Sequence, residues 1–128
     1  MIFAILYRYK ILTNPDDLFI SKKTERFTPV IEYVNNNISS SITLNNVSSL
    51  LSIDKAHFCR LFKGEFGISF VDYLNFVRIL NAERLLLTTN LTINEITEKC
   101  GFSSMAYFGK VFKKQKGCTP TEYRRYKS

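Results

Sequence analysis

Apolar residues recur at helical spacing along most of this chain after residue 27, and no stretch shows the alternating pattern of a half-buried strand. Short polar segments that contain Ser, Thr, Asp or Gly separate the apolar runs, and these residue types begin and end helices. The pattern predicts an all-α fold of about seven helices, over residues 29–36, 44–51, 54–67, 70–87, 93–100 and 105–116 and after Thr119-Pro120.

Polar residues that can cap a helix stand directly before most of the predicted helices. Their side chains accept a hydrogen bond from an N–H of the first turn. Glu95, three residues after Thr92, completes a capping box, and Asp72 after Ser69 forms a variant of one. The predicted N-caps are Thr28, Thr43, Asp54, Ser69, Thr92 and Ser104, and Gly67 and Gly117 are expected to end two helices.

One helical unit occurs twice in the chain. Residues 43–47 match residues 92–96 after a shift of 49, and residues 54–63 match residues 104–113 after a shift of 50. Each copy is a short helix, a tight turn and a longer helix, which is the plan of a helix-turn-helix. We expect two such subdomains joined by a long central helix, which spans roughly 27 Å at 1.5 Å per residue and so suits two successive major grooves of DNA.

The longer helix of each copy has an aromatic face and a face of small and basic residues. Phe58, Leu61 and Phe62 are spaced to pack in the core, as are Phe108, Val111 and Phe112. Small side chains let a helix approach the major groove, and a guanidinium matches the two acceptors of guanine, so Arg60 is the best candidate base contact. The candidate base contacts are Ala56, Cys59 and Arg60 in the first copy and Met105, Ala106, Gly109 and Lys110 in the second.

Lysines and helix N-termini supply candidate contacts to DNA phosphates. These candidates are Thr43, Lys55, Lys63, Thr92, Lys113 and Lys114. Met105, Ala106 and Gly109 offer few hydrogen bonds, so the second copy is expected to contribute more backbone and shape contact than base contact. An ordinary solvated helix face is the alternative explanation of the same residues.

Charge supports a polyanionic partner. The 128 residues carry a net charge of +7, and residues 104–128 hold seven bases and one acid. Nucleic acid is the first expectation and an anionic membrane surface the second. Three cysteines and a single histidine are too few for a disulfide framework or a zinc site, so we expect free thiols and no metal or cofactor. The apolar start is too short to span a bilayer, and a soluble cytoplasmic protein is expected.

These features resemble the C-terminal DNA-binding domain of AraC/XylS-type bacterial transcription regulators. The most specific stretch is residues 93–124, where the chain has Glu95-Ile96, Gly101-Phe102, Tyr107-Phe108, Phe112-Lys113-Lys114, Gly117, Pro120 and Tyr123-Arg124. Arg78, Ala82, Leu85 and Leu86 match the family's pattern in the central helix. The resemblance implies a nucleoid-associated DNA-binding regulator, an activator rather than a repressor, with RNA polymerase as a further partner. The oligomeric state stays open, and because one chain holds two units, the DNA-binding domain itself could act as a monomer.

The chain departs from the family pattern at four positions. Ser48 and Thr97 replace a small alanine, Ser52 replaces the glycine of the first turn, and Ser104 replaces an acid. The predicted organisation is an N-terminal segment and linker over residues 1–27, then a DNA-binding domain over residues 28–128. The first segment is too short for the regulatory domain that family members usually carry, so a stand-alone regulator and a fragment of a longer one both stay open.

Three other function classes compete with DNA-binding regulation. An enzyme is disfavoured, since the His57 and Asp54 pair is more easily explained as a helix cap than as a catalytic pair. A small protein-binding regulator could associate through residues 2–12 with a full-length relative or with RNA polymerase and bind DNA weakly. Binding of the basic C-terminal region to a membrane is disfavoured because its apolar residues are needed for the core.

Overall fold

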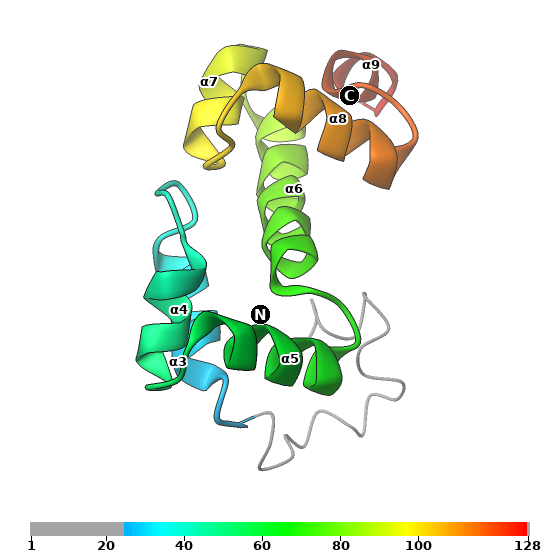
Figure 1. Ribbon diagram of the computed structural model, residues 1–128. Helices are drawn as coiled ribbons and strands as arrows, with labels where there is room; N and C mark the ends of the chain where they lie inside the picture. Colours follow the sequence, from blue (N-terminus) through cyan, green and yellow to red (C-terminus); the bar gives the residue numbers. More distant parts are fainter. Residues whose placement is uncertain (1–24, 128) are drawn as a thin grey trace. The chain divides into compact units, whose positions relative to one another are not determined.

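The computed structural model describes residues 25–127, so most of the predicted N-terminal segment lies outside the described residues. Over the described part the chain is all-α, with no strand, and its helices match the seven that the sequence predicts (Figure 1). The helices are α3 (Thr28–Asn36), α4 (Leu44–Leu50), α5 (Lys55–Phe66), α6 (Phe70–Thr88), α7 (Ile93–Lys99), α8 (Met105–Lys116) and α9 (Pro120–Lys127). None of these helices is both long enough and apolar enough to cross a membrane.

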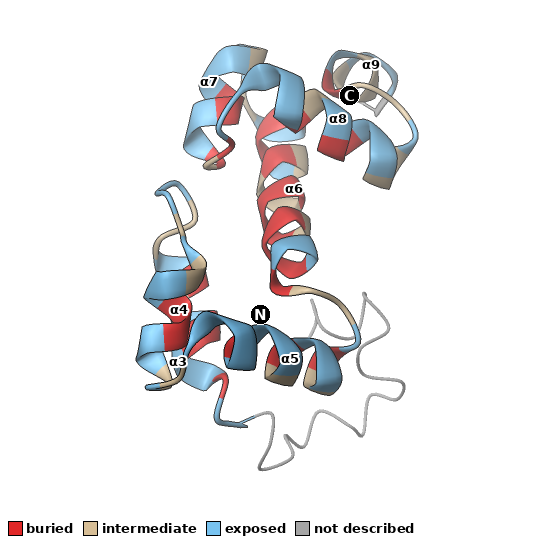
Figure 2. Ribbon diagram, in the orientation of Figure 1, coloured by how far each residue is buried: buried red, intermediate tan, exposed pale blue. Residues whose placement is uncertain are grey.

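The described residues form two compact units, each with one helix-turn-helix. The first unit holds the residues up to Asn37 together with Ile42–Tyr73, and the second holds Ile38–Ser41 and the chain from Leu74 onward. The helix α6 begins in the first unit and continues in the second, and buried residues occur along its length (Figure 2).

The predicted caps are present at nearly every helix. Thr43 and Thr92 each accept a hydrogen bond from the N–H three residues on, and Asp54, Ser69 and Ser104 do the same. Asn46 and Glu122 close two further capping boxes that the sequence interpretation overlooked. The prediction for Thr28 is wrong, because that residue is already helical and Phe27 stands at the N-cap of α3 without a side-chain hydrogen bond. The proline of the first turn, with φ fixed and no N–H to satisfy, begins this helix in place of a polar cap.

The duplication extends to the backbone geometry of the turns. Ser52 has φ 56° and Gly101 has φ 84°, so both turns pass through the left-handed region. In each turn the next residue donates its N–H to the carbonyl five residues before it. Ile53 donates to Ser48 at 3.2 Å, and Phe102 donates to Thr97 at 3.1 Å. The longer helices of the two copies, α5 and α8, also end alike, at Gly67 and Gly117 with φ 78° and 79°.

The core of the first unit is a cluster of aromatic rings. Phe58 and Phe62 of α5 are fully buried, as the sequence predicts, whereas Leu61 between them is only half-buried. Phe27 is also fully buried, and its ring lies 5.5 Å from that of Phe62 and 5.2 Å from that of Phe66, measured between centroids. The first unit therefore includes a residue that the sequence interpretation placed in the N-terminal segment.

The core of the second unit is built from α6, α7 and α8. Phe102, Phe108, Val111 and Phe112 pack with apolar residues of α6 and with the buried thiol of Cys100, whose pKa burial raises to about 11. Thr97 is buried here and Ser48 is buried in the first unit, and each hydroxyl donates to a carbonyl of the preceding turn. The polar substitutions at these two positions are thus satisfied within their own helices.

Polar contacts tie α9 to the second unit. Arg124 donates to the carbonyls of Leu86, Thr89 and Leu91, at 3.1, 3.2 and 2.7 Å, and so serves the C-terminal end of α6. Glu83 of α6 accepts a hydrogen bond from the Tyr123 hydroxyl at 2.8 Å and pairs with Lys116 at 2.7 Å. Desolvation, followed by this hydrogen bond to Glu83, raises the pKa of Tyr123 to about 12.

The segment Ile38–Ser41 is held in the second unit by hydrogen bonds to two helices, to a side chain of α6 and to a backbone carbonyl of α7. Arg78, which is buried, donates to the Ser40 carbonyl at 3.0 Å, and the Ser39 hydroxyl donates to the Lys99 carbonyl. Gly101 lies so close to this segment that a Cβ on it would collide with the carbonyl oxygen of Ile38. The glycine of the second turn is therefore required both by its φ and by this close approach.

Candidate nucleic-acid interface

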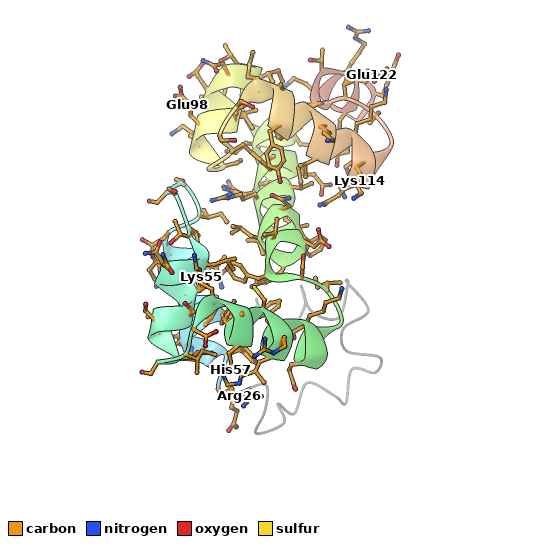
Figure 3. All side chains as sticks on the ribbon, viewed as in Figure 1. Arg26, Lys55, His57, Glu98, Lys114 and Glu122 are labelled. Atoms are coloured by element: carbon orange, nitrogen blue, oxygen red, sulfur yellow. The ribbon has the colours of Figure 1, made fainter. Side chains whose placement is uncertain are left out.

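The candidate base contacts of the first unit lie on the exposed face of α5. Ala56, Cys59 and Arg60 are all exposed, as is Lys63 near the end of the helix. Lys55, near the N-terminus of the helix, is exposed as well and is labelled in Figure 3. Phe58 and Phe62 fix the rotation of α5 because their rings are fully buried. The helix thus presents one long guanidinium between small side chains, with a lysine toward each end. That arrangement has the donor groups and the steric access that a helix in a major groove requires.

The corresponding face of α8 is more apolar, and its exposed cations are all lysines. Met105, Ala106 and Lys110 are exposed, Met105 by 50%, and Gly109 is partly exposed. The thioether and the methyl group can contact thymine methyl groups, and of these four residues only Lys110 has a side chain that can donate a hydrogen bond. Lys113 and Lys114 are exposed in the last turns, where Figure 3 labels Lys114.

Tyr107 belongs to the exposed face of α8 although the sequence interpretation did not include it. Its side chain is 38% exposed, and its hydroxyl accepts a hydrogen bond from Nδ2 of Asn75 at 2.9 Å. The phenol proton stays available for an acceptor outside the protein. The signal that could have placed Tyr107 on this face is its spacing of three residues from Lys110, which puts the two side chains on the same side of α8.

The N-termini of α4 and α7 differ in charge. The hydroxyls of Thr43 and Thr92 already accept a hydrogen bond from their helices, so the phosphate contacts predicted there would fall to backbone N–H groups. The capping box of α4 is closed by the neutral Asn46, whereas that of α7 is closed by Glu95. Hydrogen bonds from Thr92 hold the pKa of Glu95 below its usual range, which keeps the carboxylate charged. The N-terminus of α4 is therefore the better of the two for a phosphate.

Two basic side chains of α8 and α9 have partners within the protein. Lys116 pairs with Glu83, and Arg124 donates to three carbonyls, so neither is free for DNA. Arg125 of α9 is exposed and was not among the predicted contacts. Sequence alone gave no means of telling Arg124 from Arg125, because the distinction depends on which of the two faces α6.

The remaining chemically reactive side chains are accounted for by local structure. The Asp54 carboxylate accepts a hydrogen bond from the backbone N–H of His57 at 2.8 Å, which confirms that this pair is a helix cap. His57 is exposed on α5 (Figure 3). Cys59, Cys100 and Cys118 are free thiols, as expected.

Comparison with known proteins identifies relatives along most of the described chain. A family model described as a helix-turn-helix domain matches residues 47–126. The xylose operon regulatory protein of Escherichia coli is 34% identical over 94 residues, which cover 73% of this chain and 24% of that protein. The lactose operon transcription activator of Staphylococcus xylosus is 31% identical over 96 residues, covering 75% of this chain and 34% of that protein. The chain spans between 24% and 41% of the length of such relatives.

Solved structures share the fold. The C-terminal domain of the response regulator AraT from Geobacillus stearothermophilus superposes with a TM-score of 0.75 at 35% identity, covering 82% of this chain and 88% of that one. The DNA-binding domain of the transcriptional factor AdpA, solved in complex with a target DNA, superposes with a TM-score of 0.73 at 24% identity and covers 78% of this chain and 90% of that one. At this identity, the similarity to the AdpA domain shows a shared fold alone.

Proposed function

The chain belongs to the AraC-type helix-turn-helix family, and from that membership we propose that it is a sequence-specific DNA-binding regulator of transcription. The observation that carries this proposal is the duplicated unit itself. In both copies a capped short helix, a left-handed turn and a glycine-terminated helix recur, and both longer helices expose the face opposite their buried rings. A single chain with two such helices can contact two successive major grooves of promoter DNA, as a dimer of single helix-turn-helix proteins does.

The proposed contacts to bases are those of the exposed faces of α5 and α8. Arg60 recognises a guanine, and the small residues beside it allow the helix to approach the groove. Met105 and Ala106 contribute apolar contacts, and Lys110 contributes a point charge with less directional preference than a guanidinium. Lys55, Lys63, Lys113 and Lys114 contact phosphates, together with the backbone at the N-terminus of α4.

The regulatory outcome that we propose is activation in the bacterial cytoplasm. The lactose operon relative is named as a transcription activator, and we propose RNA polymerase as a further partner of this chain. The alternative of a protein-binding regulator with little DNA affinity is not favoured, since these relatives are named as operon regulators and the positive charge concentrates around a recognition helix. No chemical step is proposed, because the residues of the site are those of a binding surface.

The test of this function is selection of bound duplexes from a random pool, at two salt concentrations and with competitor DNA. Enrichment of an asymmetric sequence with two blocks about one helical turn apart is the expected result. One enriched block would restrict base recognition to one unit. Retention that depends on salt alone, with no enriched sequence, would refute sequence-specific regulation.

Replacement of Arg60 tests the principal base contact. Arg60→Ala should cost about 1–3 kcal/mol of binding free energy on the selected duplex and relax the preference at one base pair. Arg84→Ala is the matched control, because Arg84 is exposed on α6 outside the proposed contacts and its removal lowers the charge equally. Binding isotherms on selected and scrambled duplexes check both variants. Equal losses on the two duplexes for Arg60→Ala would exclude Arg60 from base recognition.

A further inference from the structure

We propose that the second unit binds any DNA duplex through its charge, whereas the first unit contributes contacts only at the target sequence. This inference rests on the proposed function. It assigns binding to any duplex to the second unit, here called the anchor, and target-specific contacts to the first unit.

The two units differ sharply in net charge although each contains one helix-turn-helix. Residues 25–37 and 42–73 of the first unit contain four basic and five acidic residues, and residues 1–24 add four basic and two acidic residues, so the unit has a net charge of +1. Residues 38–41 and 74–128 contain ten basic and four acidic residues, a net charge of +6. Attraction to a duplex of any sequence comes from cations that displace counterions from phosphates. The second unit therefore carries the charge that such attraction needs.

The cations of the second unit divide into those that hold the fold and those that face solvent. Lys116 and Arg124 have partners within the unit. The basic surface consists of the exposed side chains of Lys110, Lys113, Lys114 and Arg125. Lys113 and Arg125 both help to hold the pKa of Glu122 below its usual range, after the hydrogen bonds from Thr119, so both lie near one carboxylate. The basic surface thus runs from α8 onto α9.

The described part of the first unit exposes four cations and four acids. Lys55 and Lys63 lie on α5, while Asp54 at its N-cap and Asp72 in the first turn of α6 belong to the same unit and are exposed. At about a Debye length from the surface, the attraction of DNA to these cations is offset by its repulsion from the acids. A lysine of this unit therefore stabilises the complex only when it directly contacts a phosphate. Such contact requires that α5 sits in the groove, which Arg60 favours only where its base is present. The first unit should therefore add little to binding of unrelated DNA.

The test compares two double variants of the full chain that each remove two exposed lysines. Lys113→Gln with Lys114→Gln alters the second unit, and Lys55→Gln with Lys63→Gln alters the first. Equilibrium binding by fluorescence anisotropy is measured on the selected duplex and on a duplex of unrelated sequence, over a series of KCl concentrations. Thermal unfolding of all proteins ensures that the comparison concerns folded chains, and glutamine preserves helix propensity.

Each phosphate contact contributes about 0.9 to the slope of log K against log salt, so on the unrelated duplex the second-unit variant should lose about 1.8 from this slope. At 0.1 M salt that loss corresponds to an affinity about 60-fold lower. The first-unit variant should stay within about twofold of the parent there and lose affinity only on the selected duplex. Similar losses for the two variants on the unrelated duplex would overturn the inference. A parent protein that prefers no sequence, yet depends on Lys113 and Lys114, would refute the proposed function and leave the anchor intact.

Discussion

Ser52 shows how the duplicated turn tolerates a side chain in one copy and not in the other. Both turns need a positive φ, 56° at Ser52 and 84° at Gly101. At Gly101 a Cβ would meet the Ile38 carbonyl and the Arg78 guanidinium as well, so steric exclusion adds to the backbone preference. Ser52 is exposed, and its substitution for the glycine that is usual in the family carries only the cost of the left-handed conformation.

Ser52→Gly should stabilise the protein by about 1 kcal/mol, because the left-handed conformation costs a non-glycine residue about 1–2 kcal/mol and the freedom of glycine in the unfolded chain offsets part of this gain. Ser49→Gly, the same change inside α4, should instead destabilise by about 0.5 kcal/mol. Urea unfolding measures both. Destabilisation by both substitutions would contradict the assigned backbone conformation of the turn.

At the scale of helices, stability in the second unit depends on how helix ends are satisfied. Thr92 with Glu95 and Thr119 with Glu122 close capping boxes at the starts of α7 and α9. The end of α6 has no glycine cap, and Arg124 from α9 supplies donors to carbonyls at and beyond it. Unpaired carbonyls at a helix end are costly where water is excluded, so this guanidinium links the last helix to the long one.

Arg124→Lys should therefore lower the free energy of unfolding by about 2–4 kcal/mol, since an ammonium keeps the charge but cannot reach three carbonyls at once. Arg125→Lys is the matched control on the next residue, which is exposed, and it should change stability by less than about 0.5 kcal/mol. Chemical denaturation provides the comparison. An equal effect of the two substitutions would show that the contacts of Arg124 do not stabilise the fold.

At the scale of the whole molecule, the units do not follow the order of the chain. The segment Ile38–Ser41 lies between two helices of the first unit yet belongs to the second. Phe27 lies before the predicted domain boundary at residue 28 yet is fully buried against Phe62 and Phe66. Removal of a buried aromatic ring leaves a cavity that the surrounding rings fill only in part.

A fragment of residues 28–128 should consequently be less stable than a fragment of residues 25–128, by about 3–5 kcal/mol. The full chain with Phe27→Ala should show a loss of the same size, which separates the effect of the ring from that of the new terminus. Denaturant titrations of the three proteins measure the differences. Equal stability of the two fragments would place the domain boundary after Phe27.

The sequence by itself determined the features that depend on neighbours within a few residues. Helix positions, most caps and the buried face of each recognition helix follow from apolar spacing and from side chains that reach an N–H three residues on. For the same reason the duplication, and with it the family, could be inferred from residue types alone. The exposed candidates on α5 and α8 follow as the complement of the buried rings.

Only the tertiary structure decided what depends on residues far apart in the chain. Arg124 reaches carbonyls 33 to 38 residues away, and Tyr123 reaches Glu83 across 40, so their roles could not be assigned from local pattern. The same holds for the burial of Phe27 and for the cations of the second unit that remain free. A lysine looks alike in sequence whether it faces a carboxylate or solvent, and the folded chain determines which of these surrounds it.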